Sequence, residues 1–162
     1  MITENEKRVY EILNSLNIQY KRYAHNPIYT VDEAKKIDEM IPGKKCKNLF
    51  LKSAKENTYY LYILDEDKRA DLKSLSKKIE SSRLSFGSEE ELYDCLKLTR
   101  GSVTPFGIIN DKHNKVVILF DEELKGEGIV NFHPNVNTAT IGISQNDLER
   151  FIKFEQNEYH YV

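Results

Sequence analysis

A lysine that leads into an apolar strand is the first feature of the sequence that could do chemistry. Lys47 stands in the segment 44–51, KKCKNLFL, where cations run directly into apolar residues. Along an extended strand Lys47 shares a side with Leu49 and Leu51, so its ammonium emerges beside two residues of the core type. That ammonium could hold a phosphate or a carbonyl by charge. A strand-end lysine whose stem covers apolar surface while its charge reaches water is an equally good interpretation.

A glycine-led loop is the second candidate. Residues 101–107 read GSVTPFG, in which Gly101 permits unusual torsions and Pro105 fixes the loop before an apolar stretch. Consecutive backbone N–H groups of such a loop, here those of Gly101 and Ser102, could bind a developing oxyanion with little reorganisation. A plain turn between a helix and a strand is the alternative, and this spacing alone slightly favours the turn.

A polar loop between two apolar strands is the third candidate. The segment 132–140 contains His133 and the amides Asn135 and Asn137, which could line the mouth of a pocket. A structural loop built on Asx turns is the more frequent outcome for such a sequence. His25, two residues before Pro27, has the same two interpretations.

Metal binding and cysteine chemistry are weakly supported. No two histidines have the i, i+4 spacing of a helical metal site, so we expect no metal and no cofactor. Cys46 and Cys95 lack the paired spacing of a disulfide framework. Cys46 with His133 could act as nucleophile and base, because nearby lysines lower a thiol pKa. Strand alternation, however, places Cys46 on the side opposite Lys47, and most lone cysteines are simply packed.

Length and charge limit the class of protein. The 162 residues fit one domain, 1–162, and the net charge of −2 does not favour nucleic acid as a partner. The charge is uneven, since residues 35–83 hold 13 Lys or Arg against 8 Asp or Glu. A mixed, solvated surface is the commoner reason for such a balance. No apolar run reaches the ~18 residues of a membrane span and no signal peptide precedes the domain, so we expect a cytoplasmic protein.

Five helices are predicted from capping residues that precede apolar residues at helical spacing. The caps and the helices that they open are Thr3 (4–16), Thr30 (to about 38), Asp71 (72–79), Ser88 (to 98) and Ser144 (to 154).

Strands are predicted from runs of β-branched and aromatic residues between turn residues. They span 18–24, 46–52, 59–64, 106–109, 116–120, 129–132 and 138–143, and 158–162 is a further extended piece. Helices gathered early and late around hairpin-linked strands indicate an α+β fold with a mixed, mostly antiparallel sheet flanked by helices.

Three segments taken together carry a resemblance to a known family. The segments 46–51 and 101–107, and 132–134 with Asn137 and Thr138, resemble the YbaK and prolyl-tRNA synthetase-associated editing domains, most narrowly the free-standing alanyl-tRNA(Pro) deacylases of the ProX type. The likeness runs nearly end to end and includes His25 before the helix start at Thr30. Each motif is weak alone, but their order and spacing are specific.

The resemblance implies an editing domain with a pocket between sheet and helices. Lys47 matches the essential lysine, Asn48 its neighbour, 101–105 the GxxxP loop and His133 the pocket histidine. In this role Gly101 and Ser102 would bind the oxyanion, Lys47 the terminal phosphate or the carbonyl, and Asn48 and His133 the aminoacyl end. Further substrate contacts are expected at His25, Thr104, Pro105, Phe106, Asn137 and Thr138, with Val103, Phe106 and Ile143 as pocket walls.

The resemblance also implies a reaction and its partners. Members hydrolyse the ester that joins a wrong small amino acid, here most simply alanine, to the terminal adenosine of tRNA(Pro). Because no general base is evident, the substrate's own 2′-hydroxyl is expected to assist the attacking water. Prolyl-tRNA synthetase is a further candidate partner, and phosphate contacts are expected at Lys45, Lys52, Lys77 and Lys78. A catalytically silent module that binds charged tRNA or has a regulatory role, and a cysteine-dependent hydrolase, are the alternatives.

Overall fold

The computed structural model describes residues 2–126 and 128–162. Its helices are α1 (Glu4–Ser15), α2 (Val31–Met40), α3 (Leu72–Lys78), α4 (Glu89–Leu96) and α5 (Gln145–Glu155), with the 3₁₀ turns η1 (Pro105–Asn110) and η2 (Glu122–Leu124). Its strands are β1 (Tyr20–Ala24), β2 (Lys44–Ser53), β3 (Tyr59–Asp65), β4 (Leu84–Phe86), β5 (Val116–Phe120), β6 (Ile129–Phe132), β7 (Ala139–Ser144) and β8 (Tyr159–Tyr161).

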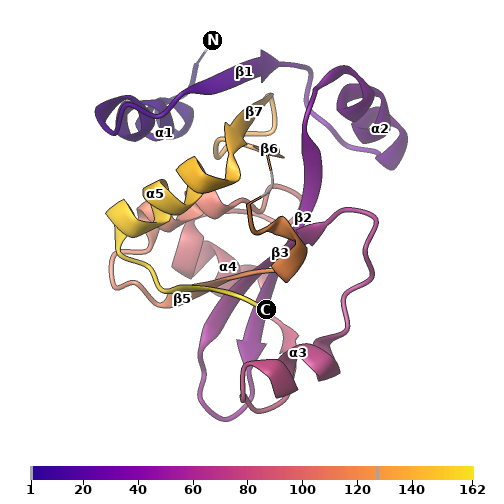
Figure 1. Cartoon of the computed structure of the whole chain (residues 1–162), viewed down its shortest axis with the longest axis vertical. Helices are drawn as coiled ribbons and strands as arrows, with labels where there is room; N and C mark the ends of the chain where they lie inside the picture. Colours follow the sequence, from indigo (N-terminus) through magenta and orange to yellow (C-terminus); the bar gives the residue numbers. More distant parts are fainter. Residues whose placement is uncertain (1, 127) are drawn as a thin grey trace.

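The strands form one sheet in the order β1-β7-β6-β2-β3-β5-β8, and β4 pairs with β2 outside this path. The pairs β1–β7, β6–β7, β2–β3 and β2–β4 are antiparallel. The pairs β2–β6, β3–β5 and β5–β8 are parallel. The mixed, mostly antiparallel sheet flanked by helices, predicted from the sequence, is therefore confirmed (Figure 1).

The long strand β2 has an interruption along one of its edges. On one side it pairs with β3 from Cys46 to Lys52. On the other side only Lys44 and Lys45 pair with β6, and only residues 51–53 pair with β4. Among the described residues, no strand therefore lies beside the middle of β2 on that edge, which leaves an opening in the sheet for loops to approach.

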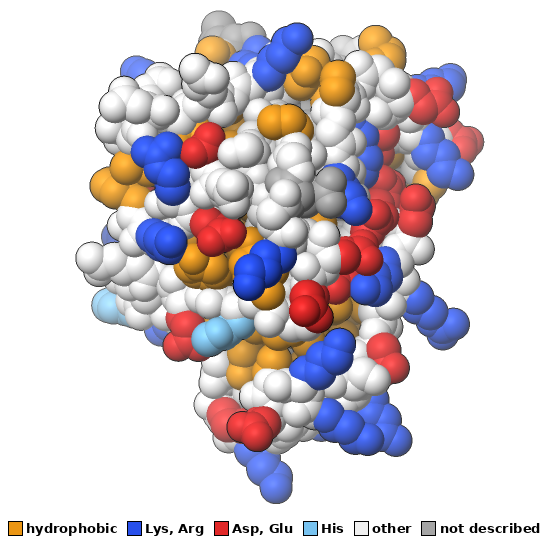
Figure 2. Space-filling view, viewed as in Figure 1, with side chains coloured by type: hydrophobic (Ala, Val, Ile, Leu, Met, Phe, Trp, Pro, Cys, Tyr) orange, Lys and Arg blue, Asp and Glu red, His pale blue; other side chains and the backbone are white. Residues whose placement is uncertain are grey.

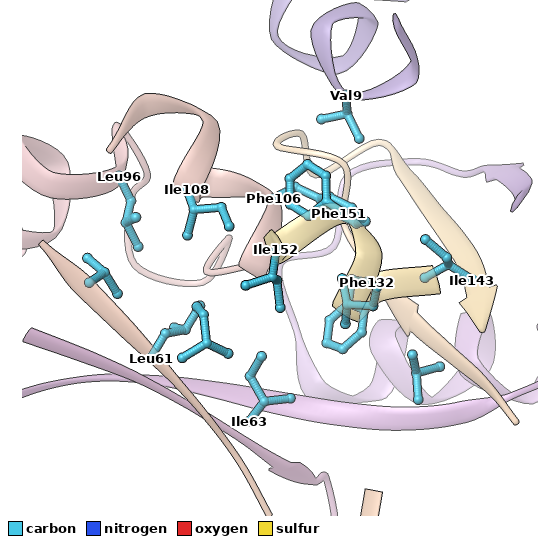
Figure 3. Close-up of a cluster of buried hydrophobic side chains, with 14 of the residues drawn as sticks. Val9, Leu61, Ile63, Leu96, Phe106, Ile108, Phe132, Ile143, Phe151 and Ile152 are labelled. Atoms are coloured by element: carbon cyan, nitrogen blue, oxygen red, sulfur yellow. The ribbon is translucent and has the colours of Figure 1, made fainter. Parts of the chain in front are cut away.

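The core lies between the sheet and the helices α1, α4 and α5. Figure 3 shows Phe106 and Phe151 in contact within it, and their ring centroids are 5.1 Å apart. The five predicted helix caps are confirmed, because the side chain of each accepts a backbone N–H of the first helical turn. These caps and the apolar faces behind them fix the helices against the sheet.

The predicted strand at 106–109 is wrong, since these residues belong to the 3₁₀ turn η1. Pro105 occupies its first turn, and the Thr104 hydroxyl accepts the Phe106 N–H at 3.4 Å. Because residues 105–108 of the turn are buried, its apolar residues mimic a core strand in the sequence. A Cβ on Gly107 would come within 2.6 Å of Leu98, so the turn also needs a glycine here. The short strand β4 was missed.

Candidate functional site

A cavity of about 240 Å³ lies at the opening beside β2. Its lining includes Lys47 and Asn48 from β2, Gly101 from the glycine-led loop, and His133 and Asn137 from the loop after β6. Segments far apart in the sequence thus meet around one hollow. All five residues are among those predicted from the sequence to contact substrate.

Asn48 ties strand β2 to the glycine-led loop. Its amide Nδ2 donates to the carbonyl oxygen of Val103 at 3.1 Å. The Asn48 Oδ1 is buried and has no hydrogen-bond partner among the described residues. The loop is tied in turn to the His133 segment, because the Thr104 hydroxyl donates to the His133 carbonyl at 2.7 Å. These bonds explain why Lys47 and Gly101 face the same cavity.

His133 is held as a neutral imidazole. Its Nδ1 lies 2.9 Å from the carbonyl oxygen of Ala139, an atom that can only accept, so Nδ1 carries the proton and Nε2 is an acceptor. Burial lowers the pKa of His133, and the nearby His25 lowers it further. The ring is therefore uncharged at pH 7 and can accept a hydrogen bond from a water or a hydroxyl.

His25 supports His133 from the end of β1. The two ring centroids are 6.0 Å apart in an edge-on arrangement. The Nδ1 of His25 donates to the Asn26 carbonyl oxygen at 2.9 Å, and its Nε2 lies 2.9 Å from the Thr140 hydroxyl. Thr140 lines the cavity, whereas His25 is not part of this lining and lines a separate hollow. His25 therefore positions cavity groups.

Only one of the two expected oxyanion donors is available. The Ser102 N–H donates to the carbonyl oxygen of Thr99 at 3.1 Å, so this donor is already occupied by a hydrogen bond within the turn. The expectation that Ser102 binds the oxyanion is wrong for this reason. Gly101 has φ +90°, a conformation that favours glycine, and its N–H makes no hydrogen bond within the described residues. Gly101 is the remaining backbone donor.

Several expected substrate contacts lie outside the cavity. Thr104, Pro105 and Phe106 are buried, and the Phe106 ring packs in the core against Phe132 and Phe151. They shape the loop from behind and do not line the hollow. Ile143 is also fully buried in the core, and neither Phe106 nor Ile143 belongs to the lining of the cavity.

Two further residues predicted to contact substrate are also absent from the lining of the 240 Å³ cavity. The carbonyl oxygen of Thr138 accepts the backbone N–H of His25 at 3.0 Å. Val103 packs partly against the core and lines a neighbouring hollow of about 460 Å³, which shares Asn48 and Gly101 with the first.

The lysines expected at tRNA phosphates have different surroundings. The Nζ of Lys45 donates to the Ile41 carbonyl oxygen at 2.6 Å, just beyond the end of α2, and burial lowers its pKa. Lys52 forms an ion pair with Glu91 at 2.7 Å. Lys77 and Lys78 are exposed in the last turn of α3. Figure 2 shows Lys and Arg side chains around the lower end of the molecule, where Figure 1 places α3.

Three polar residues of the cavity were not predicted from the sequence. Asn131 from β6, Asp38 from α2 and Glu66 after β3 all belong to the lining. Asn131 had a signal, since it is the polar residue of the otherwise apolar strand 129–132, IVNF. Asp38 and Glu66 had none, because each stands in a charged segment that resembles an ordinary solvated surface.

Cys46 lines the same cavity but is poorly suited to act as a nucleophile. Burial raises the pKa of its thiol to about 12, and the charge of Asp65 adds to the rise. The thiolate, which is the reactive form, is therefore scarce at neutral pH.

Among the described residues, no group of three or more His, Cys, Asp or Glu could hold a metal ion. The described helices are also too short or too polar to cross a membrane.

Comparison with known proteins places the chain in a family. The sequence profile of the aminoacyl-tRNA editing domain matches residues 25–151. The chain is 44% identical to the prolyl-tRNA editing protein ProX of Acetoanaerobium sticklandii over 91% of this chain and 90% of that protein. It is 32% identical to the prolyl-tRNA synthetase associated domain-containing protein 1 of Danio rerio, over 93% and 83% of the two chains.

A solved structure has the same fold. It is a candidate trans-editing enzyme for prolyl-tRNA synthetase, with a TM-score of 0.73 and 16% identity over 99% of this chain and 98% of that one. The fold, the match over most of the length and the 44% relative agree. The chain belongs to the aminoacyl-tRNA editing domain family.

Proposed function

We propose that the protein is an aminoacyl-tRNA deacylase that removes a small non-cognate amino acid, alanine in the first instance, from mischarged tRNA(Pro). The observation that carries the proposal is the meeting of Lys47, Asn48, Gly101 and His133 around one cavity of about 240 Å³. The 44% identity to a prolyl-tRNA editing protein supports tRNA(Pro) as the substrate. The same relatives make prolyl-tRNA synthetase a candidate partner, and the cytoplasm, where tRNA is charged, the proposed location.

The reaction is the hydrolysis of an ester. Water adds to the ester carbonyl carbon, the carbonyl oxygen takes the negative charge, and the bond from that carbon to the ribose oxygen then breaks. The proton lost by the water passes to the ribose oxygen, which leaves free amino acid and uncharged tRNA. The protein must bind the adenosine end, stabilise the oxyanion and position the water.

The oxyanion and the nearby phosphate require positive groups. The Gly101 N–H is the backbone donor proposed for the oxyanion, and as part of a fixed turn it needs little reorganisation. Lys47 supplies a full charge in the same cavity, suited to the terminal phosphate or to the carbonyl oxygen. One N–H alone is a weak oxyanion site, so we assign part of the stabilisation to Lys47.

The attacking water needs an acceptor. Neutral His133 offers the lone pair of Nε2, and Asn48 offers its unpaired Oδ1. These acceptors could orient the water and the ribose 2′-hydroxyl, but neither is a strong base. We therefore retain the 2′-hydroxyl as the group that assists deprotonation. A substrate that lacks this hydroxyl should react at least tenfold more slowly, and an unchanged rate would contradict its role.

Size explains why alanine enters and proline does not. A synthetase pocket built for proline gains only about 1–3 kcal/mol for each methylene that alanine lacks, so alanine is mischarged at a measurable rate. A second, smaller pocket rejects proline by its bulk.

The test is a panel of tRNA(Pro) charged with alanine, serine, cysteine or proline. Wild-type protein should release alanine fastest and leave prolyl-tRNA intact. Lys47→Ala should lower kcat/KM for alanyl-tRNA(Pro) by at least about a hundredfold. Lys55→Ala, in the turn after β2 and outside the cavity, is the matched control and should stay within about twofold of wild type. Binding of the charged tRNA with no release of any amino acid would instead support a non-catalytic module.

A further inference from the structure

One buried side chain of the cavity lacks a hydrogen-bond donor. Asn131 is 5% exposed, and its Nδ2 donates to the Pro42 carbonyl oxygen at 3.0 Å. Because that oxygen can only accept, the orientation of the amide is fixed and Oδ1 is the free atom. Oδ1 is buried and has no partner within the described residues. A buried acceptor without a donor costs free energy, which a ligand N–H would recover.

Glycines keep the space around this amide. Asn131 lies opposite Lys45 on one neighbouring strand and opposite Gly142 on the other. A Cβ at Gly142 would lie 3.1 Å from Oδ1 of Asn131, and a Cβ at Gly43 would lie 3.0 Å from its Nδ2. A side chain at either position would therefore crowd the amide. The acceptor therefore lies close to both glycines, on a residue that lines the cavity.

Two carboxylates lie on the same cavity. Asp38 comes from α2 and Glu66 follows β3, and both belong to the lining that contains Asn131. Burial raises the pKa of Glu66, and the charges of Asp38 and Asp67 raise it further, so the negative charges here repel one another. Lys45 is the adjacent cation: its charge opposes the rise at Glu66 and offsets part of the negative charge, while its ammonium donates to the Ile41 carbonyl oxygen. Figure 2 shows acidic side chains gathered on the flank below α2.

An N–H-rich cation of small size fits this combination. A protonated primary amine brings three N–H donors and one positive charge, and an α-amino group is mostly protonated at pH 7. We propose that Asn131, Asp38 and Glu66 form the subsite for the protonated α-amino group of the aminoacyl ester, with Oδ1 of Asn131 accepting one N–H and the two carboxylates supplying the charge. This subsite rests on the proposed function, because it assumes that the aminoacyl end occupies the cavity.

The subsite makes a prediction about pairs of substrates. Deamination of alanyl-tRNA(Pro) with nitrous acid gives lactyl-tRNA(Pro), which keeps the ester and the methyl group but replaces the ammonium by a hydroxyl. The kcat/KM of each variant is measured on both esters. Asp38→Asn should lose about fivefold on the alanyl ester and less than twofold on the uncharged lactyl ester. Asn131→Ala should lose about tenfold on the alanyl ester and about threefold or less on the lactyl ester, whose hydroxyl can donate only one uncharged hydrogen bond.

The pair of substrates separates recognition from folding. Damage to the fold lowers both rates equally and cancels in their ratio, as in a double-mutant cycle. Glu39→Gln removes a charge from the next residue of α2, outside the cavity, and should leave the ratio at the wild-type value. Asp38 lies on a helix with no buried residues, so its variant is expected to fold.

Each outcome has a defined meaning. A loss that is larger on the alanyl ester than on the lactyl ester in both variants supports the subsite. Equal losses on the two esters, or no loss on either, would overturn it while leaving the deacylase intact. A wild-type protein that hydrolyses neither ester would overturn the proposed function itself, and the subsite with it.

Discussion

The Nδ2 of Asn48 donates to the carbonyl oxygen of Val103 at 3.1 Å, across 55 residues of sequence. This bond holds the glycine-led loop beside the strand that carries Lys47, next to the opening at the middle of β2. The catalytic geometry proposed for the protein therefore depends on a side chain that joins two segments as well as on the groups that face the substrate.

Replacement of Asn48 by Ala should cost both stability and activity. The Val103 carbonyl would lose its partner, which lowers the free energy of unfolding by about 1–3 kcal/mol. The loop would also lose its position, so kcat/KM should fall at least about thirtyfold. Denaturant unfolding and deacylation assays check the two effects. Asn110→Ala removes a similar bond, from Nδ2 to the Leu96 carbonyl oxygen at 3.1 Å, and should cost stability alone.

His133 should make the protein less stable in mild acid. Burial lowers the pKa of the folded His133 below the ~6.5 of an unfolded chain. As the pH falls through about 6.5, the unfolded chain gains a proton that the folded protein binds more weakly, so the free energy of unfolding decreases. The loss continues until the folded pKa is reached.

The measurement for His133 is denaturant unfolding between about pH 7.5 and 5. His133→Asn should flatten the pH dependence of the free energy of unfolding relative to wild type. Identical pH dependence in wild type and His133→Asn would show that His133 carries no such linkage.

Cys46 should be dispensable for catalysis. Since burial raises the pKa of its thiol to about 12, Cys46→Ser should keep kcat within about threefold of wild type. Iodoacetamide at neutral pH should likewise leave the activity of the native protein unchanged. A complete loss of activity in Cys46→Ser, with folding intact, would favour the cysteine-dependent hydrolase.

The exposed lysines of α3 should contribute to the salt dependence of the reaction. If Lys77 and Lys78 contact tRNA phosphates, their joint replacement by Ala should reduce the slope of log kcat/KM against log salt by about 1 to 2. Joint replacement of Lys7 and Lys153, on α1 and α5, controls for net charge. Equal slopes in the two double variants would place the tRNA on another face.

The elements of this fold were largely predictable because their signals are local. A cap such as Ser88 and the apolar spacing behind it are written in adjacent residues, and the helix that they predict is present. The same reasoning failed at Phe106, where a buried 3₁₀ turn gives the same run of apolar residues as a strand. Local sequence patterns thus predict the burial of a segment more reliably than they predict its backbone torsions.

The site was predictable only in part, because its details depend on contacts between distant segments. Lys47 and His133 stand out in the sequence, and the structure places them around one cavity. The Ser102 N–H donates to the Thr99 carbonyl oxygen, and this bond follows from the geometry of the turn, which residue spacing does not reveal. The importance of Asn131 likewise follows from an oxygen left without a partner after folding.

The helix α2 has no buried residues, yet it supplies Ala34 and Asp38 to the cavity. Substitutions at these two positions should therefore carry little penalty for the core, and under the proposed function they should change which acyl groups are admitted. A change of substrate specificity among related hydrolases could therefore arise from substitutions on this helix, without compensating substitutions in the sheet. Exchange of α2 alone is thus the shortest route to a redesigned preference.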